Sequence, residues 1–82
     1  MCMSTAQAIR ELRNASLMSQ QAFATHCNLS VRAIAGYESY DREPDLESLI
    51  KIKHYSLKFA DQCPKAYAAI CDRIDERLGF HV

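Results

Sequence analysis

Apolar residues recur along this chain at intervals of three and four, and no segment shows the alternation typical of a strand. The first of these patterns predicts a helix over residues 5–16. Ser4 and Gln7 have the Ser-x-x-Gln spacing of a capping box, which sets the start of this helix at Thr5. Its apolar stripe consists of Ala8, Ile9, Leu12 and Ala15.

Two short helices are predicted next, over residues 20–26 and 31–39. A serine precedes each of them, Ser19 and Ser30, and serine is a preferred N-cap residue. Asn28 lies between them, at the point where a left-handed residue would end the first helix, and asparagine tolerates that conformation. The side chains expected to face inward are Ala22, Phe23, Cys27, Ile34 and Tyr37, with the small Ala24 where the helices cross. This layout is that of a helix-turn-helix motif.

Proline residues organise the C-terminal half of the chain. Pro44 stops any continuation of the third helix, and Asp45 is the expected N-cap of a fourth. Residues 55–61 are expected to form a short helix or a turn, with Leu57 and Phe59 buried. The apolar stripe of the fourth helix is predicted to be Leu46, Leu49, Ile50 and the aliphatic stem of Lys53.

A final helix is predicted over residues 64–78, because Pro64 suits a first helical turn and Gly79 suits a helix end. Its apolar stripe is Tyr67, Ile70, Cys71, Ile74 and Leu78. Two interpretations of this stripe stay open: it forms a dimer surface, or it closes the core. The chain as a whole is predicted to be all-α, a compact bundle of about five helices.

At 82 residues the chain has the length of one domain. No apolar run approaches the roughly 18 residues of a membrane-spanning helix, and the first residues carry no pattern of a secretory signal. These features predict a soluble cytoplasmic protein. Its ten basic and ten acidic residues cancel, with +1 over residues 1–40 and −1 over residues 61–82. This balance argues against a polybasic arm but does not exclude nucleic acid as a partner.

Residues that bind metals or act in catalysis are scattered along the chain. The four cysteines are Cys2, Cys27, Cys63 and Cys71, and the three histidines are His26, His54 and His81. No C-x-x-C pair occurs, so we expect reduced thiols that act as small apolar side chains, and no metal or other cofactor. The histidines share no partner and there is no glycine-rich phosphate loop, so the sequence does not indicate an enzyme.

Ordered fragments between Ile9 and Ile52 carry a more specific signal. They are Leu12-Arg13, Ser19-Gln20-Gln21-Ala22-Phe23-Ala24, Leu29-Ser30, Tyr37-Glu38, Arg42-Glu43-Pro44 and Leu46-Glu47-Ser48-Leu49. In their order and spacing they resemble the phage-repressor-like (Cro/CI, or XRE) helix-turn-helix family. The resemblance implies a lambda-repressor-like DNA-binding domain, with the helix-turn-helix over about residues 19–39. It leaves the helix over residues 64–78 outside the match.

The chain departs from this family at three loop positions where members usually carry glycine. These positions hold Leu17, Asn28 and Tyr40. We expect Leu17 and Tyr40 to force altered loop backbones, since glycine adopts conformations that other residues avoid. Tyr40 has a second interpretation, in which its ring lies against the phosphate backbone of DNA.

The resemblance also implies which residues contact DNA. Gln20 would bind a phosphate with help from Ser19, although Ser19 is equally explained as a helix cap. Ser30, Val31 and Arg32 would begin the recognition helix and meet base edges. Arg32 suits guanine, and its alternative is a phosphate contact or a solvated arginine. Val31 would touch a thymine methyl group or pack into the core.

Three further positions complete the implied interface. Ala35 and Gly36 have no hydrogen-bonding side chains, so they would allow the helix to approach the groove closely while reading few bases. Arg42 would face the DNA backbone, or be an uncommitted loop arginine. Arg13 and Glu38 match a family pair that forms a partly buried salt bridge beneath the DNA-facing surface, which is a structural role.

These inferences lead to two hypotheses about function. In the first, the chain is a sequence-specific transcriptional regulator, a repressor that binds an inverted-repeat operator in double-stranded DNA as a homodimer, in the cytoplasm at the nucleoid. In the second, it is a protein-interaction module, such as an antitoxin or phage-switch component, whose main partner is another protein. The zero net charge and the bare Ala35-Gly36 surface favour the second slightly.

Overall fold

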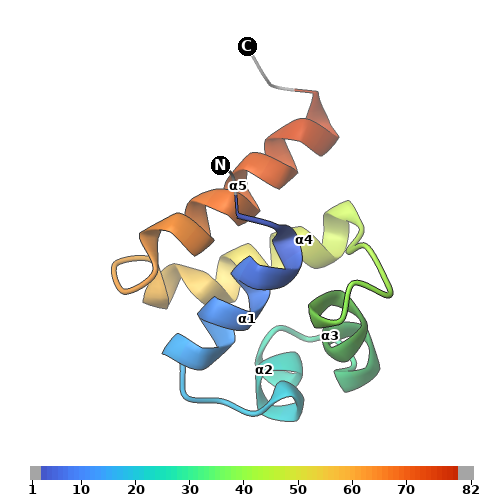
Figure 1. Cartoon of the computed structure of the whole chain (residues 1–82), viewed down its shortest axis with the longest axis vertical. Coiled ribbons are helices and arrows are strands. Elements are labelled where there is room, and N and C mark those ends of the chain that lie inside the picture. The colour runs from blue at the N-terminus through green and yellow to red at the C-terminus, as the bar shows by residue number, and fades with distance from the viewer. Residues whose placement is uncertain (1–2, 80–82) are drawn as a thin grey trace.

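The computed structural model describes residues 3–79 as five α-helices and one 3-10 turn, with no strand in that range (Figure 1). The elements are α1 (Thr5–Ala15), α2 (Gln20–His26), α3 (Val31–Glu38), α4 (Leu46–Ser56), η1 (Leu57–Phe59) and α5 (Pro64–Leu78). The prediction of an all-α bundle of about five helices is therefore confirmed. Cys2 and His81 lie outside the described residues. No helix among those described is long and apolar enough to cross a membrane.

Side-chain caps explain where the first four α-helices begin. In each case an oxygen of the N-cap side chain accepts a hydrogen bond, at 2.9–3.1 Å, from the backbone N–H three residues later. The capping residues are Ser4, Ser19, Ser30 and Asp45. Each such cap stabilises its helix by about 1 kcal/mol. α5 instead begins with Pro64 and ends at Gly79, whose φ of 78° is left-handed.

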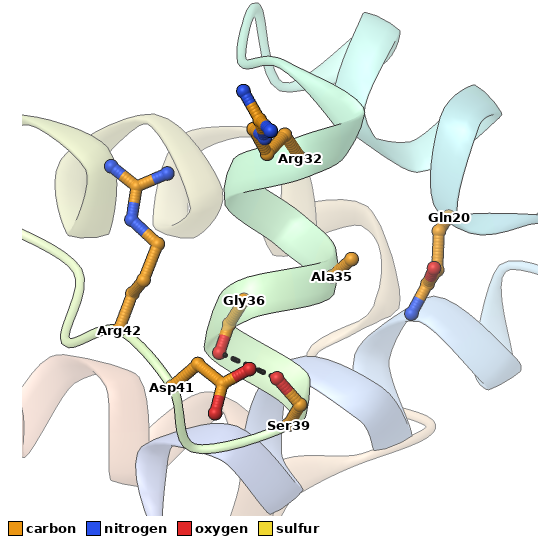
Figure 2. Close-up of a pocket in the computed structure, with 7 residues that line it drawn as sticks. All are labelled: Gln20, Arg32, Ala35, Gly36, Ser39, Asp41 and Arg42. Carbon is orange, nitrogen blue, oxygen red and sulfur yellow. Dashed lines mark hydrogen bonds between the residues drawn. The ribbon is translucent and has the colours of Figure 1, made fainter.

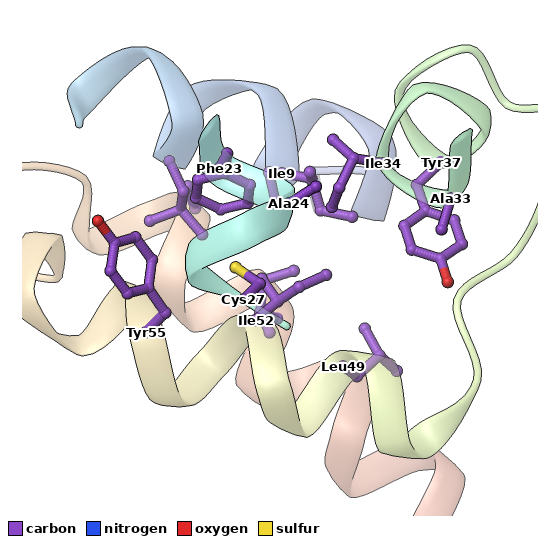
Figure 3. Close-up of a cluster of buried hydrophobic side chains, with 14 of the residues drawn as sticks. Ile9, Phe23, Ala24, Cys27, Ala33, Ile34, Tyr37, Leu49, Ile52 and Tyr55 are labelled. Carbon is purple, nitrogen blue, oxygen red and sulfur yellow. The ribbon is translucent and has the colours of Figure 1, made fainter. Parts of the chain in front are cut away.

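One apolar core joins all five α-helices (Figure 3). Its fully buried large side chains include Ile9, Leu12, Phe23, Ile34, Leu49, Ile52 and Ile70. The Phe23 ring meets the Tyr55 ring edge to face, with 5.8 Å between the ring centroids. This contact fastens α2 to α4, so the position of the helix-turn-helix on the bundle is fixed from inside.

The buried face of α4 differs from the predicted stripe. Ile52 and Tyr55 are buried with Leu49, whereas Ile50 is 47% exposed, so its predicted burial is wrong. The spacing of both sets suits a helix, and the neighbouring elements decide between them. The Tyr37 hydroxyl of α3 reaches α4 and donates to Ser48 Oγ at 3.2 Å, so the helix face that carries the small Ser48 is turned inward.

The segment after α4 also corrects a prediction. Leu57 is 62% exposed, so its expected burial is wrong, while Phe59 is partly buried against the core. α4 continues helically through Tyr55 and the buried Ser56, and the 3-10 turn that follows directs Leu57 outward. Phe59 then turns back toward Tyr55, with 5.8 Å between their ring centroids.

α5 packs mainly against α1 and α4. Ile70 and Ile74 are buried, together with Ala66, which was not part of the predicted stripe. Tyr67 and Cys71 are only partly buried, and Leu78 is 45% exposed. These positions support the interpretation in which the stripe closes the core.

Candidate nucleic-acid interface

The turn between α2 and α3 holds the two helices in a fixed relation. Asn28 adopts the left-handed conformation, with φ at 58°, and the next amide, Leu29 N–H, donates to Ala24 O at 2.8 Å. Ala24 itself is buried where the helices cross, so only a small side chain fits there. The turn therefore directs α3 across α2 with its first residues pointing into solvent.

α3 has an inner and an outer side. Ala33, Ile34 and Tyr37 are buried in the core. Ser30, Val31 and Arg32 are exposed at the start of the helix, and Ala35 and Gly36 are half-buried. Val31 is 44% exposed, so the alternative in which it packs into the core is wrong.

An open groove runs along the outer side of α3 (Figure 2). We call it the outer groove, and the residues that line it are Gln20, Arg32, Ala35, Gly36, Ser39, Asp41 and Arg42. Five of these are among the residues predicted to contact DNA. Ser19, Ser30 and Val31 do not line it, and both serines use their hydroxyls to cap helices. Ser39 and Asp41 were missed, since neither carries a sequence signal for DNA contact.

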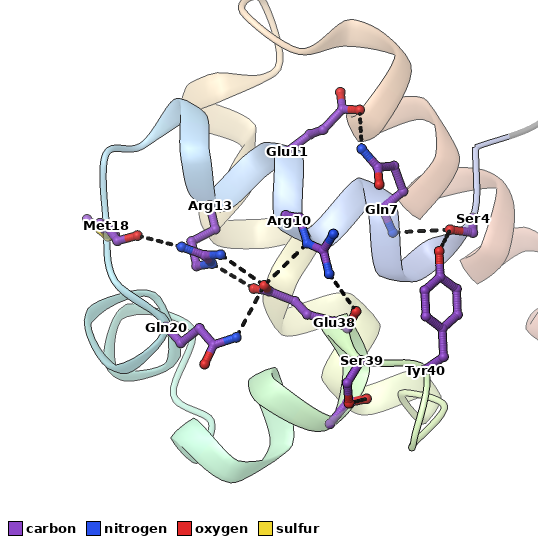
Figure 4. A network of polar contacts seen from close by, with 11 residues as sticks. Ser4, Gln7, Arg10, Glu11, Arg13, Met18, Gln20, Glu38, Ser39 and Tyr40 are labelled. Atoms are coloured by element: carbon purple, nitrogen blue, oxygen red, sulfur yellow. Dashed lines mark hydrogen bonds and ion pairs between the residues drawn. The ribbon is translucent and has the colours of Figure 1, made fainter.

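A polar cluster lies behind the outer groove, on the inner side of the motif (Figure 4). We call Arg10, Arg13, Gln20 and Glu38 the Glu38 cluster. Arg13 makes a two-point ion pair with Glu38, from Nε to Oε2 at 2.7 Å and from Nη2 to Oε1 at 2.9 Å. The Glu38 side chain is only 4% exposed, so its charge depends on these donors. The hydrogen bond to Glu38 raises the pKa of Arg13.

Two other members complete the Glu38 cluster. Arg10 Nη2 donates to the backbone oxygen of Glu38 at 3.0 Å, and Gln20 Nε2 donates to its Oε1 at 3.3 Å. Arg10 is three residues from Arg13, so both lie on one face of α1, and the Arg10 side chain stays 47% exposed. The cluster ties α1 and the start of α2 to the end of α3.

The comparison with protein families rests on the same region. A family model described as helix-turn-helix, of the Cro/CI (XRE) type, matches residues 9–54, more than half of the chain. The chain belongs to this helix-turn-helix family. Its members are DNA-binding regulators and are typically not enzymes. No curated protein and no solved structure matches the chain significantly.

This helix-turn-helix protein keeps left-handed loop residues at its three unusual positions. The φ angles are 59° at Leu17, 58° at Asn28 and 67° at Tyr40. The expectation that Leu17 and Tyr40 alter the loop backbone is therefore wrong at these residues: each adopts the conformation that glycine would favour. Left-handed backbone costs a residue with a Cβ roughly 1–2 kcal/mol, and asparagine tolerates it best.

Tyr40 has a partner within the helix-turn-helix protein itself. Its hydroxyl lies 3.2 Å from Ser4 Oγ, the N-cap of α1. The contact links the loop after α3 to the start of α1, while the side chain stays 69% exposed.

Three of the four cysteines lie within the described residues. Cys27 is buried, Cys63 and Cys71 are partly buried, and all three are free thiols. Among residues 3–79, no group of three His, Cys, Asp or Glu side chains is placed to hold a metal ion.

Proposed function

We propose that this protein is a transcriptional repressor that binds an inverted-repeat operator as a homodimer and inserts α3 into the major groove of DNA. Family membership makes it a DNA-binding regulator in general terms. The observation that carries the finer proposal is the outer groove, where Arg32 and Arg42 present guanidinium groups beside a helix with small outward residues.

The chemistry of the outer side of α3 suits base reading. Arg32 is exposed in the first turn of the helix, and arginine donates two parallel hydrogen bonds to guanine O6 and N7. Val31 offers an apolar surface for a thymine methyl group, and Ser30 lies directly before it at the N-terminal end of the same helix. The half-buried, small Ala35 allows the helix to lie close to the bases in the groove.

Phosphate contacts would come from α2, whose first residue is Gln20. The Gln20 side chain already donates to Glu38, which holds the amide at the edge of the outer groove. Ser19 lies beside it at the helix start, and side chains of this kind position a protein on the DNA backbone. These phosphate contacts would fix the position of α3 along the DNA and so determine which base Arg32 meets.

A homodimer doubles the small number of contacts that one copy makes. Two-fold symmetry would then match an inverted repeat, with half-sites about 34 Å apart, or one helical turn of DNA. Since Ile70 and Ile74 are occupied in the core, α5 would contribute to such a dimer only through its more exposed residues, such as Leu78.

The test is fluorescence anisotropy of the purified protein with DNA from upstream of its own gene, against scrambled competitor, at two salt concentrations. We expect tight binding that resists the competitor and weakens steeply with salt. Arg32→Ala should lose this preference, whereas Lys65→Ala, which removes an exposed charge at the start of α5, should not.

A second candidate function is the protein-interaction module. Asp41 favours it, because an acidic side chain lines the outer groove where DNA phosphates would approach. If this function holds, the anisotropy titration will give little duplex affinity at about 150 mM salt and no preference over competitor.

A further inference from the structure

We propose that Arg42, which lies outside the recognition helix, replaces the missing side chain of Gly36 and reads a second base edge beside Arg32. The inference rests on the proposed DNA-binding function and deepens it. It changes the role of Arg42 from a contact with the DNA backbone to a determinant of sequence specificity.

The first observation is the space above Gly36. A Cβ atom added to Gly36 would lie 2.7 Å from Cδ of Arg42 and 3.0 Å from its Cγ, closer than side-chain atoms pack. Gly36 has no left-handed backbone, so its conformation does not require glycine. A glycine inside a helix costs about 1 kcal/mol relative to alanine. The close packing of the Arg42 stem gives a physical reason for glycine at this position.

The second observation is that the loop carrying Arg42 is fastened down. The amides of Asp41 and Arg42 both donate to the carbonyl oxygen of Gly36, at 3.0 and 3.2 Å. Two residues later, Pro44 is buried and its carbonyl accepts a hydrogen bond from Arg77 Nη2 at 3.0 Å. The chain on both sides of the Arg42 stem is thus held against the bundle.

The third observation concerns the guanidinium groups. Arg10 and Arg13 donate to Glu38, Arg73 pairs with Glu43 and Glu76, and Arg77 donates to Pro44 O. Among the described residues, Arg32 and Arg42 are the two arginines for which no hydrogen bond or ion pair to the protein is found. Both are exposed, and Figure 2 shows Arg42 extending along α3 in the direction of Arg32.

These observations together place two donor groups on one helix face. Residues 32 and 36 are four apart, so they lie above one another on the outer side of α3. The Arg42 stem covers position 36, and the Arg42 side chain lines the same groove as Arg32. Two arginines without carboxylate partners suit a ligand rich in acceptors, and guanine presents O6 and N7 in the major groove. We therefore expect each half-site to contain two G·C pairs, one for each arginine.

The experiment selects sites for the full-length chain from a random double-stranded DNA library and measures affinities for the selected site and its single-base variants. In the wild-type selection we expect two strongly preferred guanines per half-site. Arg32→Ala should remove the preference at one of them and Arg42→Ala at the other, each with a roughly 5- to 150-fold loss of affinity for the best site. Lys65→Ala is the charge control and should keep both preferences.

Gly36→Ala tests the mechanism without touching either arginine. Its methyl group should displace the Arg42 stem and remove the same base preference as Arg42→Ala, while the helix melts no earlier because alanine favours helix. The double variant Gly36→Ala/Arg42→Ala should bind no more weakly than either single variant, since both remove one contact.

Several outcomes would overturn the assignment. If Arg42→Ala lowers the affinity for all DNA sequences equally, and the salt dependence of binding falls by about one phosphate contact, Arg42 is a contact to the DNA backbone. That outcome leaves the proposed function intact. Additive losses in the double variant show that Gly36 serves only the close approach of the helix. A wild-type chain that enriches no sequence overturns the proposed function and this assignment together.

Discussion

The two sides of the helix-turn-helix use the same residue type in opposite ways. On the inner side, Arg10 and Arg13 donate hydrogen bonds to Glu38 and so link α1 to the end of α3. On the outer side, Arg32 and Arg42 line a groove with no protein partner found among the described residues. The difference teaches that the position of one buried carboxylate, Glu38, decides which arginines of the helix-turn-helix are held within the protein.

Removing Glu38 is the most direct way to break the inner side. Glu38→Ala would leave Arg13, whose side chain is 18% exposed, without its partner, and breaking a buried pair in this way costs about 3–5 kcal/mol. We expect a large fall in the urea midpoint of unfolding. Glu47→Ala removes an exposed acid from α4 and should change the midpoint little. Equal midpoints for wild type and Glu38→Ala would show that the Glu38 cluster contributes nothing to stability.

Removing Arg32 sharpens the comparison from the outer side. Arg32→Ala should leave the free energy of unfolding within about 0.5 kcal/mol of wild type, because the exposed side chain has no partner to lose. Its affinity for the preferred DNA site should fall by about 1–3 kcal/mol and relax one base position. Anisotropy and urea unfolding on the same preparation separate the two effects. A stability loss as large as that of Glu38→Ala would erase the distinction between the two sides.

The stability of the protein at alkaline pH tests how fully the inner side is buried from water. Burial raises the pKa of the Cys27 thiol to about 12. The unfolded thiol ionises near pH 9, so the folded state holds more protons between these values and loses stability as pH rises above 9. The contribution of Cys27 is fully present below pH 9 and falls by about 1.4 kcal/mol by pH 10. Urea unfolding of Cys27→Ala against wild type at pH 8 and pH 10 isolates this thiol from the tyrosines and lysines. A wild-type chain with the same pH dependence as the variant would contradict the prediction.

The smallest expected effect comes from the loop between α1 and α2. Leu17 is 93% exposed with φ at 59°, so Leu17→Gly loses almost no packing and relieves the left-handed strain, a gain of about 1 kcal/mol. The same substitution at the exposed Leu57, in the 3-10 turn, meets no such strain and should destabilise by about 0.5–1 kcal/mol. Thermal melts of the two variants should therefore shift in opposite directions, and shifts of the same sign would contradict the role of strain.

The helix boundaries were predictable because short-range chemistry sets them. Ser19 and Ser30 cap α2 and α3, and Pro64 and Gly79 bound α5, as the sequence indicated. The faces of α4 were not predictable, because two stripes in an 11-residue helix both fit helical spacing. Packing against the neighbouring helices buries the stripe that contains Ile52 and leaves Ile50 exposed.

The candidate site, like the fold, has one part that could be predicted from the sequence and one part that could not. Arg13 and Glu38 were predicted from family resemblance, and the structure places them in contact. The packing of Arg42 over Gly36 was not predicted, since it depends on how the loop after α3 folds back. A signal was present in the glycine itself: it lies inside a helix where no turn requires it, which indicates that another group needs the space.

The packing of α5 has a consequence for when the chain can fold during its synthesis. The segment matched by the family ends at residue 54, yet α1 and α4 complete their burial only when Ile70 and Ile74 pack against them. During synthesis the helix-turn-helix leaves the ribosome before α5, with the apolar faces of α1 and α4 still uncovered. We expect the nascent chain to remain unfolded and dependent on chaperones until α5 has emerged, so that the regulator becomes competent to bind DNA only once this helix has packed.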